Sequence, residues 1–379
     1  MAAAKKKTKK VTKKPVKRVV RKPAKKVPAK LRAKRKAKAK SVIARHEGNP
    51  IIEPSYDNHW EAKATFNPTA LHADGKVHII YRAIGTDDVS RLGYARSDDG
   101  LSIDERLTQP CYTIGHAVPT ASLDYQIPYC SGGGWNGGCE DPRLTLIGDR
   151  VYIIYTAFDG WGSVRMALSS ISLDDFLARR WNWRKPVIIS PPGEIHKNWV
   201  LFPEKINGKF AILHSLTPEV RVDYFDSLDE LDGVTKFIRS SHVGRRADAG
   251  GAWDSFVRGV GPAPIKTKYG WLVLYHGMDD RDPNRYKLGA MILDKDDPTK
   301  VLYRAKKAIL APDECYENEG YKSGVIYSCG AVVMGEELFV YYGGADKVTC
   351  VATVHLDSFL KELVANGAVS LKRRATLRR

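Results

Sequence analysis

The chain of 379 residues carries 61 Lys and Arg against 43 Asp and Glu, a formal net charge of +18 at pH 7. The first 45 residues hold 21 of these basic side chains and no acidic one, since the first acid is Glu47. The remaining residues balance 40 basic against 43 acidic side chains, a net charge of −3. A basic core that binds nucleic acid is therefore excluded, and the positive charge belongs to an N-terminal tail.

Residues 1–45 consist almost entirely of Ala, Lys, Arg, Val, Pro and Thr. Such a segment buries too little apolar surface to offset the entropy lost on ordering. We therefore predict a disordered tail over residues 1–45 and a folded catalytic domain over residues 46–379. Two hypotheses fit the tail equally: nonspecific contact with nucleic acid or another polyanion, or a solvated segment with only weak affinity for polyanions.

Signals for export or membrane insertion are missing from the sequence. No stretch approaches the roughly 20 consecutive apolar residues of a transmembrane helix, and the N-terminus lacks the apolar segment of a secretory signal. The six cysteines form no CxxC pair. These observations predict a cytoplasmic protein with reduced thiols and no membrane partner. A homo-oligomer is compatible with the sequence.

From Ile51 onward the sequence is typical of short strands, and it contains an internal repeat. Each copy is a Gly-containing turn followed by an apolar strand. The five copies are DGKVHIIYRA (74–83), GDRVYIIYTA (148–157), NGKFAILHSL (207–216), YGWLVLYHG (269–277) and GEELFVYYGG (335–344). The residues that follow these strands are 74, 58, 62 and 67 positions apart, which leaves room for about four short strands in each repeat.

Strand-only repeats at this spacing are typical of propeller blades, so we predict an all-β fold, a five-bladed β-propeller. One short amphipathic helix is predicted at the C-terminal end, over residues 356–366. Polar residues follow the strands at corresponding positions and are expected to converge on a central funnel: Arg82, Thr156, His214 and His276. A β-sandwich with coincidental hairpins is the alternative, but it does not explain this recurrence.

The most distinctive motif is Glu140-Asp141-Pro142-Arg143, which follows a Gly-rich run. The glycines allow close approach of the backbone to a ligand, and Pro142 favours an extended backbone at Asp141. Two interpretations remain open for these charges. They bind and act on a substrate, or Asp141 and Arg143 form a structural ion pair at the edge of a blade.

A second group of residues has the chemistry of a phosphate pocket. It consists of Lys197, Arg258, His276 and Tyr286. An ammonium, a guanidinium and hydrogen-bonding rings together suit a phosphate group, although each residue alone is more often a surface charge or a buried structural residue. The motifs GxxxxGK[ST], HExxH and GxSxG are all absent from the sequence.

Taken in order, the motifs of the folded part resemble glycoside hydrolase family 130, the β-mannoside phosphorylases and related β-mannosidases. The matching pieces include FNPTA (66–70), SRLGYARSDDG (90–100), EDPR (140–143), VLFPEKINGKF (200–210), GPAPI (261–265) and YYGGAD (341–346). The resemblance covers roughly residues 48–360 and implies a five-bladed propeller. The sequence departs from the mannooligosaccharide phosphorylases at LFPEK in place of LFPRK, at Lys197 in place of an arginine, and at His214-Ser215 in place of a second arginine. The run HKNWVLFPEK (196–205) looks closer to the branch that includes β-1,2-mannoside enzymes.

The resemblance also implies roles for individual residues. Asp141 corresponds to the general acid of the family, which works through the 3-hydroxyl of the sugar. The expected substrate-binding residues are Asn67, Arg82, Glu140, Arg143 and Asp346. The expected phosphate-binding residues are Lys197, Arg258, His276 and Tyr286. Neither a metal nor an organic cofactor is implied, and inorganic phosphate is the co-substrate.

The function predicted from these residues is inverting phosphorolysis of β-1,4- or β-1,2-mannooligosaccharides to α-mannose 1-phosphate, a hexosyl transfer to phosphate. An inverting hydrolase would need a second carboxylate, about 6.5–9.5 Å from the acid, to activate water. The candidates for that base are Glu204 and Glu140. An inverting β-mannosidase is the first alternative, and a sugar-binding propeller without catalysis is the second.

Overall fold

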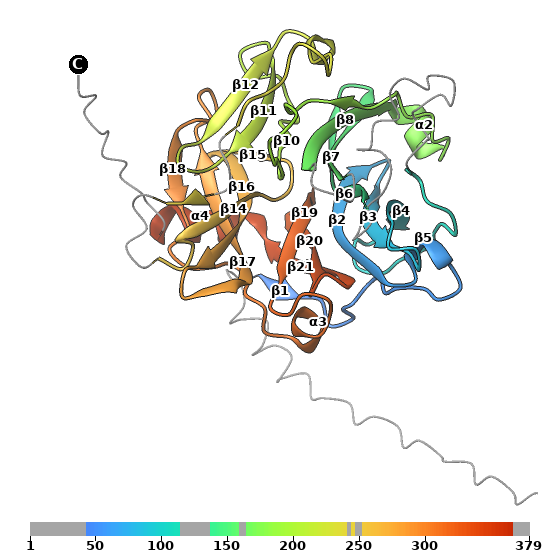
Figure 1. The fold of residues 1–379 in the computed structure, drawn as a ribbon. Helices are drawn as coiled ribbons and strands as arrows, with labels where there is room; N and C mark the ends of the chain where they lie inside the picture. The colour runs from blue at the N-terminus through green and yellow to red at the C-terminus, as the bar shows by residue number, and fades with distance from the viewer. Residues whose placement is uncertain (1–42, 114–136, 159–163, 241–243, 247–251, 367–379) are drawn as a thin grey trace, which may run out of the picture. The chain divides into compact units, whose positions relative to one another are not determined.

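The computed structural model describes residues 43–113, 137–158, 164–240, 244–246 and 252–366 (Figure 1). Strands dominate these ranges, so the predicted all-β class is confirmed. The helical elements in them are η1 (His59–Glu61), α2 (Leu173–Leu177), η5 (Leu228–Glu230), α3 (Cys315–Asn318) and α4 (Leu356–Asn366). The predicted C-terminal helix coincides with α4. None of the described helices is both long enough and apolar enough to cross a membrane.

The strands form five antiparallel meanders in chain order. The first contains β2 (Ala64–Ala73), β3 (Lys76–Ile84), β4 (Ser90–Ser97) and β5 (Glu105–Arg106). The second contains β6 (Gly138–Ile147), β7 (Arg150–Phe158), β8 (Val164–Ser172) and β9 (Val187–Ile188). The third contains β10 (Val200–Leu201), β11 (Phe210–Ser215) and β12 (Arg221–Phe225).

The last two meanders are built in the same way, with two strands (β13 and β15) added to the fourth and one (β1) to the fifth. The fourth contains β13 (Gly244–Arg245), β14 (Phe256–Val260), β15 (Ile265–Thr267), β16 (Gly270–Asp279), β17 (Asp282–Leu293) and β18 (Val301–Arg304). The fifth contains β19 (Ile326–Met334), β20 (Glu337–Gly344), β21 (Val348–His355) and the N-terminal strand β1 (Ala44–Arg45). In Figure 1, β2, β6 and β19 lie next to one another near the middle.

Each of the five sequence repeats forms the second long strand of a meander: β3, β7, β11, β16 or β20. Side chains of a strand alternate between its two faces. Neighbouring residues of these strands therefore enter different apolar clusters. The clusters pair Ile80 with Ile153, Ile154 with Ile212, Leu213 with Val273, Leu274 with Val340, and Tyr341 with Ile79. The last cluster joins the fifth meander to the first, so the order of packing is cyclic.

The N-terminal strand belongs to the fifth meander. Ala44 and Arg45 on β1 pair with Thr353 and Ala352 on β21, and Ile43 is buried. The predicted end of the tail at residue 45 is therefore wrong by at least three residues. Composition gave no sign of this pairing, because the partner strand lies about 300 residues further along the chain. Residues 1–42 lie outside the described ranges, and their disorder stays a prediction.

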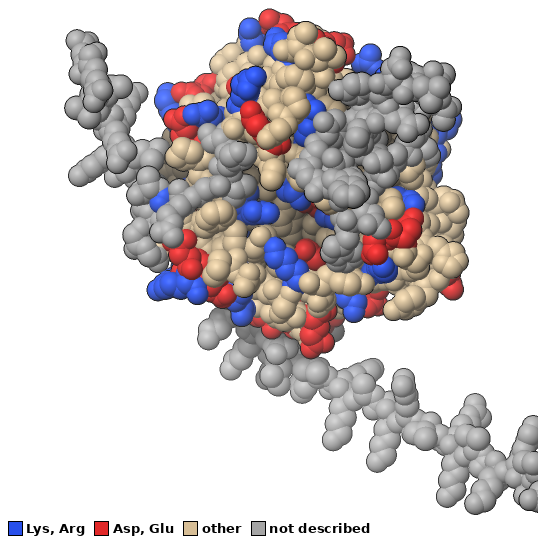
Figure 2. Space-filling model, viewed as in Figure 1, with Lys and Arg blue, Asp and Glu red and all other residues tan. Residues whose placement is uncertain are grey.

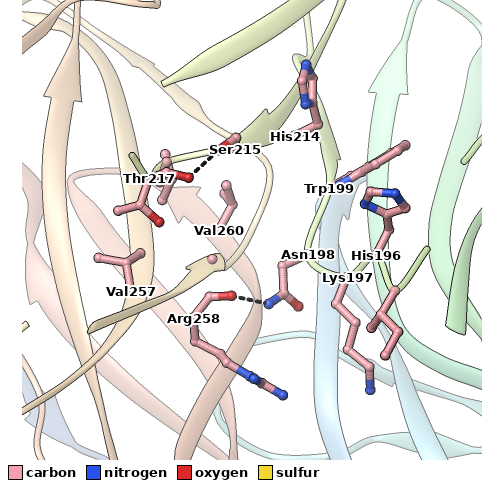
Figure 3. A pocket seen from close by; sticks show the side chains of 13 residues that line it. His196, Lys197, Asn198, Trp199, His214, Ser215, Thr217, Val257, Arg258 and Val260 are labelled. Carbon is pink, nitrogen blue, oxygen red and sulfur yellow. Dashed lines mark hydrogen bonds between the residues drawn. The ribbon is translucent and has the colours of Figure 1, made fainter. Parts of the chain in front are cut away.

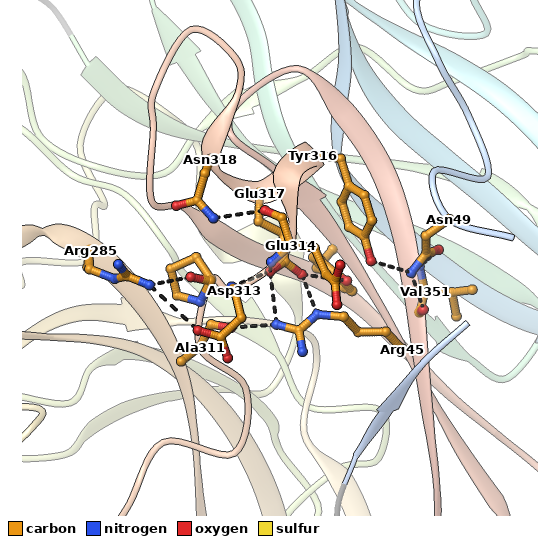
Figure 4. Close-up of polar contacts among 12 residues, drawn as sticks. Arg45, Asn49, Arg285, Ala311, Asp313, Glu314, Tyr316, Glu317, Asn318 and Val351 are labelled. Carbon is orange, nitrogen blue, oxygen red and sulfur yellow. Dashed lines mark hydrogen bonds and ion pairs between the residues drawn. The ribbon is translucent and has the colours of Figure 1, made fainter. Parts of the chain in front are cut away.

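Arg45 ties this strand to α3 (Figure 4). Its guanidinium donates to both carboxylate oxygens of Glu317, at 2.7 and 2.9 Å, and to the carbonyl oxygen of Ala311 at 2.5 Å. Glu317 is fully buried and also accepts hydrogen bonds from the Tyr342 hydroxyl and from two backbone N–H groups at 313 and 314. These partners compensate a charge that would be costly to bury alone.

We expect Arg45→Met to lower the free energy of unfolding by about 3 kcal/mol, because it leaves the buried Glu317 carboxylate without its cation. Urea unfolding followed by circular dichroism measures the change. Arg184→Met is the control, since Arg184 pairs with Asp229 at 3.5 Å and both side chains are mostly exposed. Loss of such a surface pair costs less than about 1 kcal/mol. Equal losses in the two variants would contradict the role given to Arg45.

Candidate active site

The site is built on β-bulges in the first long strand of four meanders. The register shifts by one residue between Phe66 and Thr69, Glu140 and Arg143, Val257 and Gly259, and Ser328 and Gly330. A bulge leaves its extra residue outside the ladder and redirects the side chain. The bulges contain Asn67, Asp141 and Arg258. The same type of backbone irregularity therefore directs the side chains of three predicted site residues.

Asn67 and Asp141 occupy equivalent bulge positions, and a proline follows each of them. Both have left-handed backbones, with φ of 49° and 50°. Asn and Asp tolerate this conformation better than most side chains do. The extended backbone that Pro142 predicts at Asp141 is therefore not found, because the bulge overrides that preference. The two side chains meet, and Nδ2 of Asn67 donates to Oδ1 of Asp141 at 2.8 Å.

The Asp141 carboxylate is buried among positive charges. Arg82 donates from Nη1 to Oδ1 at 3.2 Å. Burial alone would raise the pKa of Asp141, but the charges of Arg82, Lys197 and Arg143, with the Asn67 hydrogen bond, hold this pKa below its usual range. Asp141 is therefore ionised at neutral pH in the ligand-free protein, whereas a general acid must carry a proton.

Glu140 is held between two cations. Arg82 donates from Nη2 to Oε1 of Glu140 at 2.8 Å, and Nζ of Lys197 lies 3.0 Å from Oε2. Arg82 is itself oriented by a hydrogen bond from Nε to the Ser90 hydroxyl, at 2.9 Å, and its guanidinium lies over the Phe66 ring. Arg82 therefore connects the two neighbouring carboxylates of the Glu140-Asp141 motif.

Asp346 supplies a third carboxyl group from the turn between β20 and β21, with φ of 52°. Burial raises the pKa of Asp346 to about 6, and the charge of Asp141 adds to this effect. Nearby cations act in the opposite direction, and Arg82 is the strongest of them. In mildly acidic solution, Asp346 rather than Asp141 is therefore the carboxyl that holds a proton.

Gly343 explains why the fifth repeat lacks a polar side chain after its strand. A Cβ atom at this position would lie 2.4 Å from Oδ1 of Asn67 and 2.6 Å from its backbone nitrogen. Only glycine leaves room for the bulge that carries Asn67. Gly343 of the fifth meander is equivalent in position to Arg82 of the first. The fifth meander thus leaves open space where the first places an arginine side chain.

The Arg143 guanidinium is hydrogen-bonded to protein groups and does not face an open space. Its guanidinium donates to the carbonyl oxygens of Gly261 (3.0 Å), Asp141 (2.7 Å) and Val260 (3.2 Å), and to Oδ1 of Asn198 (2.9 Å). No ion pair among the described residues joins Arg143 to the Asp141 carboxylate, so the alternative of a structural ion pair is not found. Substrate contact by Arg143 stays a prediction, and the geometry instead indicates that it fixes the backbone of the Asp141 bulge.

His276 is buried and stacks on Tyr327, with ring centroids 4.0 Å apart and planes 3° from parallel. The backbone N–H of Ser328 donates to Nε2 at 2.9 Å. Burial, with the charge of Arg143, lowers the pKa of His276 to about 3. A neutral ring whose Nε2 accepts carries its proton on Nδ1. Nδ1 is buried and has no hydrogen-bond partner in the described part of the chain, which is uncommon for a buried donor.

Lys197 and Arg258 approach one pocket from its two sides (Figure 3). The pocket has about 370 Å³ of empty space, part of it open to solvent. Its lining residues are Ile195, His196, Lys197, Asn198, Trp199, His214, Ser215, Leu216, Thr217, Val257, Arg258, Gly259 and Val260. No carboxylate is among them. In the space-filling view, Lys and Arg side chains gather around a hollow in the middle of this face (Figure 2).

The structure brings the predicted residues into two groups. The first joins the three carboxyls to their cations and consists of Asn67, Arg82, Glu140, Asp141, Lys197 and Asp346. In the second, the Arg258 guanidinium lies 6.0 Å from the centre of the Tyr286 ring. The charges of Asp141 and Arg258 both act on His276, which places it near both groups.

Glu204 stands apart from these groups. It is exposed on the turn between β10 and β11 and pairs with Lys266 on β15. Sequence reasoning also missed two residues that orient the site, Asn198 and Tyr327. Asn198 accepts from both Arg143 and the Tyr327 hydroxyl, and it donates to the backbone of Arg258 at 2.8 Å. The adjacency of Asn198 to Lys197 was its one signal in the sequence.

Comparisons with known proteins point to one family. A sequence model of glycoside hydrolase family 130, described as beta-1,4-mannooligosaccharide phosphorylase, matches residues 33–364. A 1,2-beta-oligomannan phosphorylase of Thermoanaerobacter sp. is 36% identical over 83% of this chain and 97% of that protein. A beta-1,2-mannobiose phosphorylase of the same organism is 33% identical over 82% of this chain and 97% of that protein.

A solved structure is similar in fold. The Listeria innocua beta-1,2-mannobiose phosphorylase, in complex with beta-1,2-mannobiose, has a TM-score of 0.64 and 27% identity, covering 85% of this chain and 99% of that one. Clustered carboxylates in a cleft are typical of enzymes that act on glycosides. The chain belongs to glycoside hydrolase family 130.

We expect His276→Asn to keep more affinity for inorganic phosphate than His276→Gln. The amide nitrogen of Asn falls near the position of Nδ1, the free donor, whereas the amide of Gln reaches the position of Nε2, which accepts from Ser328. Isothermal titration calorimetry with phosphate measures both variants against the wild type. Tighter binding by the Gln variant would mean that the tautomer is assigned wrongly.

Proposed function

We propose that this protein catalyses inverting phosphorolysis of β-mannosides. The observation that carries the proposal is the pocket between Lys197 and Arg258, whose lining contains two cations and no carboxylate. The two cations of this lining attract a phosphate dianion. The free Nδ1–H of His276 and the Tyr286 ring complete the proposed phosphate-binding set. Phosphate is the co-substrate, and no metal or organic cofactor takes part.

We also infer that the five meanders are the blades of a closed five-bladed β-propeller. Five apolar clusters that link neighbouring meanders in cyclic order support this inference. The contact of β2 with β19 and the pairing of β1 with β21 support closure between the first and last blades. Closure would bring the bulges of different blades to one central funnel.

In the proposed reaction, an oxygen of phosphate attacks the anomeric carbon of the terminal mannosyl unit. The bond from this carbon to the glycosidic oxygen breaks, and that oxygen takes a proton that comes from Asp141 through the 3-hydroxyl of the sugar. The products are α-mannose 1-phosphate and a mannoside shortened by one unit. Asn67, Arg82, Glu140 and Asp346 surround Asp141 and are the proposed sugar-binding residues. Holding both reactants in one site supplies much of the rate enhancement.

Asp141 must gain a proton before it can act as the acid. In the ligand-free protein, the charge of Lys197 is one of those that lower the pKa of Asp141. A phosphate dianion next to Lys197 offsets this charge, so phosphate binding raises the pKa of Asp141 toward the range of a working acid. Binding of the nucleophile and protonation of the acid are then coupled.

We propose the β-1,2-linkage for the substrate. Two relatives with more than 30% identity over most of the chain are named as enzymes of β-1,2-linked mannosides, and so is the Listeria protein of similar fold. The β-1,4-linkage is the competing assignment, supported by the description of the family model.

Hydrolysis is less well supported, because both carboxylates that the sequence suggested as a base, Glu204 and Glu140, are paired with cations. Glu204 is exposed and paired with Lys266. Glu140 forms ion pairs with both Arg82 and Lys197. Sugar binding without catalysis does not account for the cationic pocket. The cytoplasmic location, the oligomeric state and contact of the tail with polyanions stay predictions.

The phosphate requirement gives the direct test. We expect wild-type protein to cleave β-1,2-mannobiose only when inorganic phosphate is present, and to release α-mannose 1-phosphate together with mannose in equal amounts. Chromatography with and without phosphate measures both products, and β-1,4-mannobiose is the matched substrate for linkage. Cleavage without phosphate would contradict phosphorolysis and favour the hydrolase.

The roles of the carboxylates are tested by amide variants. We expect Asp141→Asn to lower kcat by about 100- to 10,000-fold, the usual contribution of a general acid, and Glu204→Gln to leave kcat unchanged. Initial rates at saturating phosphate and β-1,2-mannobiose measure both. A large loss in the Glu204 variant would support a hydrolytic base instead.

A further inference from the structure

Lys322 lies next to both groups of the active site, although no sequence motif pointed to it. It belongs to the loop between α3 and β19. Nζ of Lys322 lies 3.8 Å from the centre of the Tyr286 ring, and its positive charge also acts on Asp346. The side chain therefore lies near a proposed phosphate-binding residue and a proposed sugar-binding residue together.

The loop is held firmly against the turn that carries Asp346. The backbone N–H of Lys322 donates to the carbonyl oxygen of Ala345 at 3.0 Å. A Cβ atom at Gly320 would lie 2.3 Å from this same oxygen, so the close approach requires glycine. The other end of the loop is fixed by hydrogen bonds from the N–H groups of residues 324 and 325 to the carbonyl of Glu317. Lys322 thus projects from a rigid segment.

Two cations share the Tyr286 ring. The Arg258 guanidinium lies 6.0 Å from its centre and the Lys322 ammonium 3.8 Å. In the described part of the chain, neither charged group has a hydrogen bond or ion pair with a carboxylate. Like charges at one aromatic ring repel each other, and an anion between them removes that cost. The three donors of the ammonium are also free to bind it.

We propose that Lys322 is a further ligand-binding residue of this site, whose ammonium donates to the bound phosphate on the side facing the sugar held by Asp346. The inference rests on the proposed function, and it adds a residue that links the phosphate to the sugar. Lys322, Arg258 and Lys197 then surround the phosphate from three separate meanders or loops. Each supplies charge from a different direction.

Lys322 also affects the ionisation of Asp346. The groups that act on this carboxyl are Arg82 on β3, Asp141 on β6, Lys197 before β10 and Lys322 before β19. Loss of the Lys322 charge removes one of the cations that lower the pKa of Asp346. An ionised Asp346 is needed to accept hydrogen bonds from sugar hydroxyls. The acidic limb of kcat/KM therefore moves to higher pH when Lys322 is neutralised.

The test compares Lys322→Gln, Lys322→Arg and Lys347→Gln with the wild type. Lys347 is the matched control, since it is exposed on the neighbouring turn. Calorimetry with inorganic phosphate is expected to give affinity weaker by about tenfold or more for Lys322→Gln, the value of a charge-assisted hydrogen bond. Lys322→Arg keeps the charge and is expected to keep most of the affinity, and Lys347→Gln to match the wild type.

The pH profile of kcat/KM is the second measurement, with the acidic limb expected at higher pH in Lys322→Gln only. Wild-type phosphate affinity together with an unmoved limb in Lys322→Gln would overturn the proposal. An incorrect proposed function would give a different result, since the wild type would then cleave the substrate without phosphate. The calorimetric comparison does not depend on turnover, so it decides the role of Lys322 in either case.

Discussion

The left-handed backbone at Asn67 and Asp141 is the constraint on which the rest of the site depends. At both positions a bulge and a following proline turn the side chain out of its own sheet, and the two side chains meet at 2.8 Å. Conformations of this kind cost energy and persist where the surroundings impose them. Gly343 leaves the space for one bulge, and Arg143 anchors the backbone of the other. The stability of neighbouring strands thus holds the Asp141 carboxylate in position.

Charge is distributed unequally over the active site. The three carboxyls at Glu140, Asp141 and Asp346 share Arg82, and the charge of Lys197 acts on all three as well. The cations Arg258 and Lys322 form no ion pair with a carboxylate in the described part of the chain. One half of the site is therefore close to neutral and suits a sugar, whereas the other half keeps an excess of positive charge and suits an anion.

The sequence predicted the structural features that recur along the chain. The five apolar repeats identified the second long strands, because alternating burial leaves a period in the sequence. The residues after them, together with the family motifs, led to Arg82, Asp141 and His276. Lys322, Asn198 and Tyr327 were missed because their roles come from contacts with distant segments, and such contacts leave no local pattern. The same reason explains the wrong tail boundary at residue 45, where pairing with β21 outweighs composition.

The attachment of the N-terminal strand through Arg45 and Glu317 has a thermodynamic consequence. The carbonyl of Glu317 accepts the hydrogen bonds that fix the Lys322 loop, so the strand and the loop share one anchoring residue. Segments that share an anchor tend to open as one cooperative unit. If ligand binds only while this unit is closed, then ligand binding stabilises the attachment of β1. The attachment of β1 strengthens ligand binding by the same free energy. Ligand binding at the active site would then be detected as slower exchange of the backbone amide hydrogens in β1, a strand that touches no substrate.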